Sequence, residues 1–168
     1  MKKILSAILV AIICVLICAC DPGTLVINRD SLDSVITIEL IEYKNSNQNH
    51  FISWVPNHFD ELLPFDTDKA SVVESLPTEK IPAFLDDFSK THILHTYYAY
   101  NSPKDICIRL NYENGDFLII WADYARGSFG GYIGEYSANG EVLSFWGSFS
   151  ALDYYEELVN NYFDYNLQ

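Results

Sequence analysis

Residues 105–124 read DICIRLNYENGDFLIIWADY, two largely apolar segments on either side of an Asn114-Gly115 pair. This pair is the strongest short-range signal for a β-hairpin, because a tight two-residue turn needs a positive φ at both positions. The pattern therefore predicts antiparallel strands over residues 105–113 and 116–124. A two-residue turn would place three facing pairs on the core face of the sheet: Tyr112 with Phe117, Leu110 with Ile119, and Ile108 with Trp121.

The opposite face of this hairpin is mixed in character. Its first strand carries Arg109 and Asn111, whereas its second strand carries Leu118 and Ile120. Apolar residues on both sides of one strand are typical of a strand that is buried on both faces. We therefore expect the second strand to be central in the sheet and its other face to be partly covered.

A second hairpin is predicted further along the chain. Residues 132–137 and 141–146 flank Asn139-Gly140. Here the pattern leaves two readings open, a two-residue turn or a longer turn that ends at Gly140 with a bulge, which would shift the register. The two hairpins are too short to count as an internal repeat.

The remaining segments complete an α+β domain. Residues 35–43 are β-branched and aromatic and predict a strand, residues 51–55 and 70–74 predict short strands, and residues 93–100 look extended. Helices are expected over 78–90 and 150–163; in the first, Ile81, Phe84, Leu85 and Phe88 form one apolar stripe. We expect a single domain over 24–168, an antiparallel β-sheet built largely from hairpins with two helices packed on one face.

The N-terminus has the features of a secretory signal. Lys2 and Lys3 precede an apolar run over residues 4–17, which is shorter than the roughly 20 apolar residues that span a bilayer. The run ends in Ile17-Cys18-Ala19-Cys20, which resembles the lipobox of bacterial lipoproteins. The alternative is a plain N-terminal membrane helix.

The resemblance to a lipobox implies a specific processing and location. It implies a signal peptide over residues 1–19, lipid attachment at Cys20, and a short tether over residues 20–23. A palmitate-bearing lipoprotein of this kind would be held at the cell membrane on its extracytoplasmic face, since two or more acyl chains anchor stably. Asp21 resembles an inner-membrane retention signal, which has meaning only in bacteria with two membranes.

Charge and cysteine content narrow the function. The chain has 10 basic and 23 acidic residues, a net charge of −13. Cleavage before Cys20 would leave 8 basic and 23 acidic residues, a net charge of −15. Such a surface excludes nucleic acid as a partner, because nucleic-acid binding needs a basic footprint. With Cys14 and Cys18 removed and Cys20 lipidated, Cys107 stands alone, so no intramolecular disulfide is expected.

No residue pattern predicts a catalytic centre, a metal site or a cofactor. His92 and His95 are three apart without a third ligand, His50 and His58 are isolated, and Asp66 and Asp68 begin a calcium loop that does not continue. Cys107 lies between two isoleucines, as a packed thiol does, and the glycines of 127–131 are expected only to connect the hairpins. Paired acids at Asp86-Asp87 and Glu156-Glu157 are expected on exposed helix faces. A glycosidase would instead start from Glu135 and Asp123.

The aromatic content is the strongest hint of a binding function. Some of these rings must be core, but aromatics exposed on a sheet or loop bind sugars and protein partners. The candidate ligand-binding residues are Tyr97, Tyr98, Tyr100, Tyr124, Tyr132 and Trp146. We expect a non-enzymatic binding or accessory protein of the cell envelope, with a glycan, a peptide or a basic protein as partner. The alternatives are an envelope hydrolase and a structural component of an envelope complex.

Overall fold

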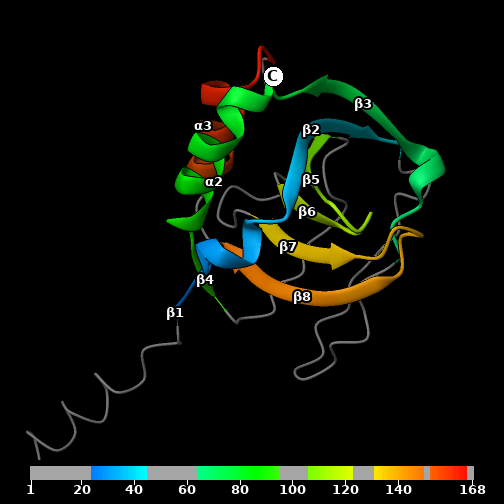
Figure 1. The fold of residues 1–168 in the computed structure, drawn as a ribbon, viewed down its shortest axis with the longest axis horizontal. Helices are drawn as coiled ribbons and strands as arrows, with labels where there is room; N and C mark the ends of the chain where they lie inside the picture. The colour runs from blue at the N-terminus through cyan, green and yellow to red at the C-terminus, as the bar shows by residue number, and fades with distance from the viewer. Residues whose placement is uncertain (1–23, 45–63, 95–105, 123–130, 150–151, 166–168) are drawn as a thin grey trace, which may run out of the picture.

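The described residues fold around one antiparallel β-sheet with two α-helices, as expected (Figure 1). The computed structural model describes residues 24–44, 64–94, 106–122, 131–149 and 152–165. The strands are β1 (Thr24–Val26), β2 (Val35–Tyr43), β3 (Ala70–Ser75), β4 (His92–Leu94), β5 (Ile106–Tyr112), β6 (Phe117–Ala122), β7 (Gly131–Tyr136) and β8 (Val142–Phe149). The helices are α2 (Ile81–Ser89) and α3 (Leu152–Tyr162), with 3-10 turns η1 (Arg29–Leu32), η3 (Thr67–Lys69) and η4 (Thr78–Lys80).

The sheet has the strand order β1-β4-β8-β7-β6-β5-β2-β3. Strand β6 lies between β5 and β7, which confirms that the second strand of the first hairpin is central. The predicted strand over residues 35–43 is confirmed, and that over 70–74 is confirmed with one further residue. The strand predicted over 51–55 lies outside the described residues, as does most of the extended segment 93–100.

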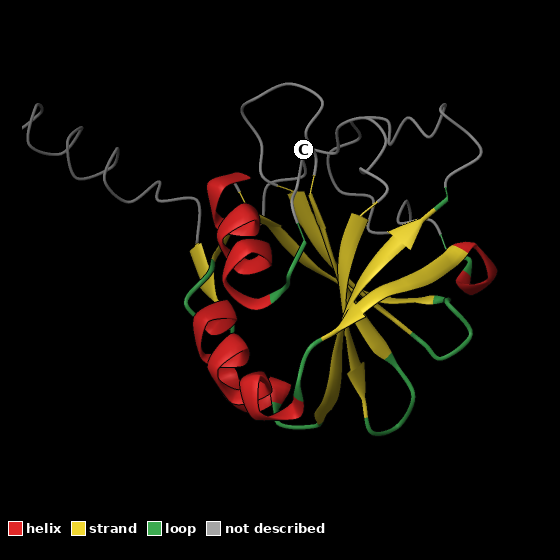
Figure 2. Ribbon diagram, turned by 90° about the horizontal axis from the view of Figure 1, so that it is seen from above, coloured by secondary structure: helices red, strands yellow, loops and turns green. Residues whose placement is uncertain are grey.

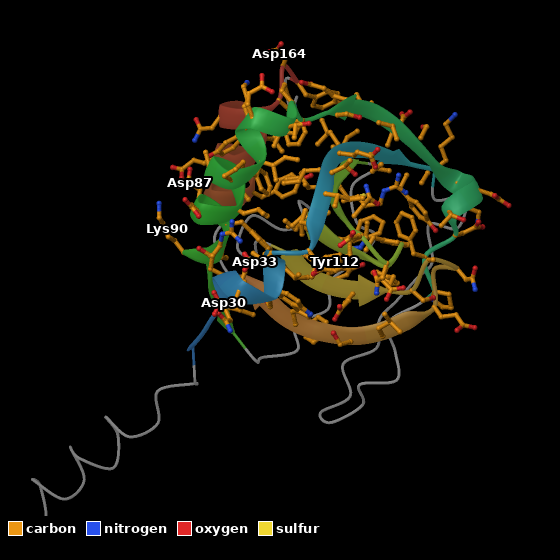
Figure 3. The ribbon with its side chains drawn as sticks, viewed as in Figure 1. Asp30, Asp33, Asp87, Lys90, Tyr112 and Asp164 are labelled. Atoms are coloured by element: carbon orange, nitrogen blue, oxygen red, sulfur yellow. The ribbon has the colours of Figure 1, made fainter. Side chains whose placement is uncertain are left out.

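Both helices pack on one face of the sheet, which we call the helix face (Figure 2). The predicted apolar stripe of α2 is buried, and Tyr155, Leu158 and Val159 of α3 join it in one core with Ile108, Leu110, Leu118 and Ile120 of the sheet. The helix predicted over 78–90 is a 3-10 turn followed by α2, with Pro82 in the first turn, where no backbone N–H is lost. Tyr162 of α3 donates to Asp87 Oδ2 of α2 at 2.6 Å. Lys90 pairs with Asp87 Oδ1 at 2.7 Å, and both residues are labelled in Figure 3.

The predicted register of the first hairpin is wrong by one residue. Gly115 N–H donates to the carbonyl oxygen of Tyr112 at 3.0 Å, and Tyr112 N–H donates to that of Asp116 at 2.9 Å, so the loop has three residues. Gly115, with φ +91°, occupies the bulge position. The observed facing pairs include Leu110 with Leu118, Ile108 with Ile120, and Cys107 with Trp121.

This shift divides the six predicted core residues between the two faces. Tyr112, Leu110 and Ile108 lie on the helix face, whereas Phe117, Ile119 and Trp121 lie on the other. The second hairpin has the same loop: Gly140 N–H donates to the carbonyl oxygen of Ser137 at 2.8 Å, and Gly140 has φ +80°. For this hairpin, the longer turn with a bulge is the correct reading of the two.

The second face of the sheet has a core of its own, and we call it the Phe65 face. Phe65 is 3% exposed and packs among the rings of Tyr43, Phe117, Trp121 and Tyr136, at centroid distances of 4.8–5.8 Å. Its N–H donates to the carbonyl oxygen of Gly140 at 2.7 Å. The segment that leads into β3 is thereby held against the turn of the second hairpin.

Candidate functional site

The predicted ligand-binding aromatics are only partly within the described residues. Tyr97, Tyr98, Tyr100 and Tyr124 lie outside them, as does the predicted lipid attachment site Cys20. Tyr132 and Trp146 are described, and both are half-buried.

Tyr132 and Trp146 lie on opposite faces of the sheet. Tyr132 stacks on Trp121 at 6.0 Å and belongs to the Phe65 face. Trp146 packs against the core of the helix face. These two rings therefore do not form a common stacking platform.

Trp146 instead belongs to a polar group centred on Glu135. Glu135 of β7 faces Ser144 of β8, and Trp146 is two residues further along the same face of β8. Glu135 Oε2 accepts hydrogen bonds from Ser144 Oγ at 2.7 Å and from the Trp146 indole Nε1 at 3.1 Å. The carboxylate is thus held in place by two uncharged donors from the neighbouring strand.

Tyr112 of β5 lies on the same face of the sheet, beyond the central strand β6. It stands opposite Val35 at the start of β2 and is labelled in Figure 3. Tyr112 is 6% exposed, and its hydroxyl has no hydrogen-bond partner in the part of the chain that the structure describes. Burial raises the pKa of the Tyr112 phenol, and the nearby charge of Glu135 raises that pKa further. We call Glu135, Ser144 and Trp146 the Glu135 site.

The Glu135 site has the chemistry of recognition. It offers one negative charge, the remaining acceptor positions of that carboxylate, and an aromatic ring. Glycoside hydrolysis needs a second carboxylate across a gap of roughly 5–9 Å. The other acid named for that chemistry, Asp123, lies outside the described residues.

A second polar cluster lies on the Phe65 face, and the sequence did not predict it. Glu39 Oε2 accepts from Arg109 Nη2 at 2.7 Å, from Arg109 Nε at 3.0 Å and from Asn111 Nδ2 at 2.9 Å. Asn111 Nδ2 also donates to Thr37 Oγ1 at 2.8 Å. The alternation of Thr37 and Glu39 on one strand with Arg109 and Asn111 on another is the only signal in the sequence that could have found it. Glu39 is neutralised within the fold, so this cluster stabilises the pairing of β2 with β5.

The metal-binding hints find no support in the described residues. Asp66 Oδ1 caps η3 by accepting from Asp68 N–H at 3.2 Å, and Asp66 Oδ2 pairs with Lys69 at 3.1 Å. Within the described ranges, no three His, Cys, Asp or Glu side chains are grouped so as to hold a metal ion. His92 begins β4, whereas His50, His58 and His95 fall outside those ranges.

We predict that the Cys107 thiol is inert in the folded protein. It is fully buried, and burial raises the pKa of the thiol far above its ordinary value, so the reactive thiolate is suppressed. Alkylation by iodoacetamide at pH 8, followed by peptide mass spectrometry, should be about a thousandfold slower at Cys107 than in urea, because modification requires opening of the fold. Rapid modification without denaturant would contradict this packing and reopen a role for Cys107 as a nucleophile.

The chain matches no protein-family model, no curated protein and no solved structure. Among the described helices, none has the length and apolar character needed to cross a membrane. The function must therefore be inferred from the N-terminal residues and from the Glu135 site.

Proposed function

We propose that this protein is a lipoprotein of the bacterial cell envelope that binds a ligand or partner without transforming it. It is anchored to a membrane through lipid on Cys20 and faces away from the cytoplasm. The anchor is supported by the basic start, the apolar run and the Ile17-Cys18-Ala19-Cys20 sequence. The short tether of residues 20–23 holds the domain close to the membrane surface.

The observation that carries the binding function is the Glu135 site. Within this fold, the half-buried carboxylate of Glu39 is paired with Arg109. Glu135 has only uncharged donors among the described residues, namely Ser144 Oγ and the Trp146 indole N–H. A carboxylate with unused acceptor positions, held in place by hydrogen bonds from the adjacent strand, favours recognition of a ligand.

A purely structural role is less well supported. It predicts a large apolar patch on an uncovered face of the sheet. In the described part of the chain, each face of the sheet has its own buried core. The exposed large apolar residues Ile36, Val72 and Val73 lie at the β2–β3 edge, whereas Leu143 lies on β8, on the other side of the central strands.

Lipid attachment at Cys20 is tested by metabolic labelling. Cells that express the full chain with an alkyne analogue of palmitate should yield a labelled protein in the membrane fraction. Replacement of Cys20 by alanine should abolish the label and leave an unprocessed, longer chain, whereas the matched variant Cys18→Ala should label normally. Label retained in Cys20→Ala would overturn the proposed anchor.

Binding is tested by thermal melting of the same protein with soluble cell-wall fragments, sugars and basic proteins. A ligand that binds only the folded state raises the melting temperature, since it stabilises by about 2.7 kcal/mol at a hundredfold excess over its dissociation constant. A shift that is lost in Glu135→Gln supports the proposal. Release of reducing sugar from cell wall by the wild type but not by Glu135→Gln would identify a hydrolase instead.

A further inference from the structure

We propose that Asn139 is a site of spontaneous covalent modification, at which the asparagine loses ammonia and becomes an isoaspartyl or aspartyl residue. The co-reactant is water. The inference concerns the turn of the second hairpin and does not depend on the proposed binding function. It follows from a contrast between the two Asn-Gly turns of the sheet, because only the first of them holds its asparagine side chain in place.

The reaction joins the asparagine side chain to the main chain that follows it. The main-chain nitrogen of Gly140 attacks Cγ of Asn139 and loses its proton. The N–Cγ bond forms, the Cγ–Nδ2 bond breaks, and ammonia leaves with that proton. Water then opens the resulting cyclic imide. If the N–Cγ bond breaks, the product is aspartate, and if the bond from the nitrogen to the main-chain carbonyl carbon breaks, the product is isoaspartate. One water is consumed for each ammonia released.

A glycine after the asparagine favours this reaction. Glycine has no Cβ, so its nitrogen is uncrowded and its main chain rotates more freely than that of other residues. The pairs Asn114-Gly115 and Asn139-Gly140 occupy equivalent positions in two three-residue loops. Both asparagines are exposed, so water reaches both. The two turns therefore start from the same local chemistry.

Asn114 is held away from this reaction by its own side chain. Its Oδ1 accepts from the Asp116 N–H at 3.0 Å, and its Nδ2 donates to Asp116 Oδ2 at 2.7 Å. The bond to the carboxylate is charge-assisted and is therefore one of the stronger kind. Both bonds must break before Cγ of Asn114 can turn toward the Gly115 nitrogen.

Asn139 lacks this restraint. The residue equivalent to Asp116 is Glu141, and its N–H donates to Ser137 Oγ at 3.2 Å. Ser137 thus takes the donor that holds the asparagine in the first turn. The Asn139 side chain makes no hydrogen bond within the described ranges, so its Cγ can rotate toward the Gly140 nitrogen without the loss of a side-chain bond.

The main-chain restraints do not reverse this order. The Gly115 N–H donates to the carbonyl oxygen of Tyr112 at 3.0 Å. The Gly140 N–H donates to that of Ser137 at 2.8 Å, so the attacking nitrogen is held once in each turn. The Phe65 N–H bonds to the Gly140 carbonyl, which belongs to the next peptide group and does not hold the attacking nitrogen. The difference between the two sites therefore lies in the asparagine side chains.

Formation of isoaspartate from Asn139 would disturb the contact between the second hairpin and Phe65. In isoaspartate the main chain runs through Cβ and Cγ, which lengthens it immediately before Gly140. Gly140 has no space to accommodate this change, because even an added Cβ would lie 1.9 Å from the Phe65 carbonyl oxygen. We therefore expect the modification to break the hydrogen bond from the Phe65 N–H and to loosen the segment that leads into β3.

The test is ageing of the full chain at pH 8, extracted in a non-ionic detergent, followed by peptide mass spectrometry that separates isoaspartate from aspartate. Asn139 should react about tenfold or more faster than Asn114, because two side-chain bonds must break only at Asn114. In urea, where the contacts of both turns are absent, the two rates should converge. Equal rates in the folded protein, or the same ratio of rates in urea, would overturn the inference.

Asp116→Ala tests the cause of the difference. It removes the acceptor of Asn114 Nδ2 and should raise the rate at Asn114 severalfold in the folded protein. An unchanged rate at Asn114 would overturn the assigned protection by Asp116.

Melting of aged samples gives an independent readout. The melting temperature of the wild type should fall as isoaspartate accumulates, whereas Asn139→Ser, which cannot form the imide, should keep its melting temperature after the same ageing. Fresh Asn139→Asp carries the new charge on an ordinary main chain and should melt like fresh wild type. A fall in aged Asn139→Ser equal to that of the wild type would overturn the link between the modification and the Phe65 segment. A fall in fresh Asn139→Asp equal to that of aged wild type would assign the effect to charge and would likewise overturn this link.

Discussion

Replacement of Gly140 by alanine is expected to destabilise the protein by about 3 kcal/mol or more. A Cβ at this position would lie 1.9 Å from the carbonyl oxygen of Phe65, a contact that only a movement of the main chain can relieve. Gly140 also has φ +80°, a conformation that costs an L-residue about 1–2 kcal/mol. The steric and conformational penalties act together, because Gly140 both needs the positive φ and accepts the hydrogen bond from the Phe65 N–H. Urea denaturation of the purified protein measures the change.

Gly115→Ala is the matched control for this prediction. Gly115 has the same place in the first hairpin and a φ of +91°, but its added Cβ would meet only the Cβ of Ala138, at an ordinary 3.5 Å. We expect it to cost about 1–2 kcal/mol, the conformational penalty alone. Equal destabilisation by the two substitutions would mean that the contact with the Phe65 main chain does not constrain the second hairpin.

The elements with strong local patterns were predictable from the sequence. Val35–Tyr43 is rich in β-branched residues and ends on an aromatic one, and the α2 stripe from Ile81 to Phe88 repeats with the helical period. These signals depend only on neighbours in the chain. They were sufficient to give the α+β class, the antiparallel sheet and the placement of both helices on one face.

Register was not predictable in the same way. Asn-Gly suits both a two-residue turn and a three-residue loop with a bulge, and a single residue moves every side chain of one strand to the other face. The wrong choice at Gly115 therefore put Tyr112 and Trp121 on one face, whereas the structure separates them. The second hairpin, for which both readings stayed open, has the bulge at Gly140.

The contacts of the candidate site also could not be predicted from the sequence. Glu135 and Trp146 were each named from the sequence, the first for hydrolysis and the second for stacking. Their hydrogen bond depends on how β7 and β8 pair through two register shifts. The pair of Glu39 with Arg109 joins residues 70 positions apart. No local pattern in the sequence specifies such contacts.

The Phe65 ring is expected to contribute as much to the free energy of unfolding as Gly140, the turn glycine against which the Phe65 main chain lies. Phe65→Ala should destabilise the protein by about 3–5 kcal/mol, because it removes a 3% exposed ring and leaves a cavity between four aromatic side chains. Phe65→Leu retains much of the volume and should cost roughly 1–2 kcal/mol, which keeps a folded variant available for measurement. Leu143→Ala, at a side chain that is 52% exposed, should change the free energy of unfolding by less than about 0.5 kcal/mol.

Combining Phe65→Ala with Gly140→Ala tests whether the Phe65 ring and the Gly140 turn are energetically coupled. The Phe65 ring fixes the segment that leads into β3 against the sheet, and the Phe65 N–H fixes it to the Gly140 carbonyl. Either substitution alone should therefore release this segment from the second hairpin. Once the segment is released, the second substitution loses most of its effect, and the double variant should be more stable than the sum of the two losses predicts. Additive losses in urea denaturation would mean that the Phe65 ring and the Gly140 turn stabilise the fold independently, and that the second core does not depend on the position of the segment.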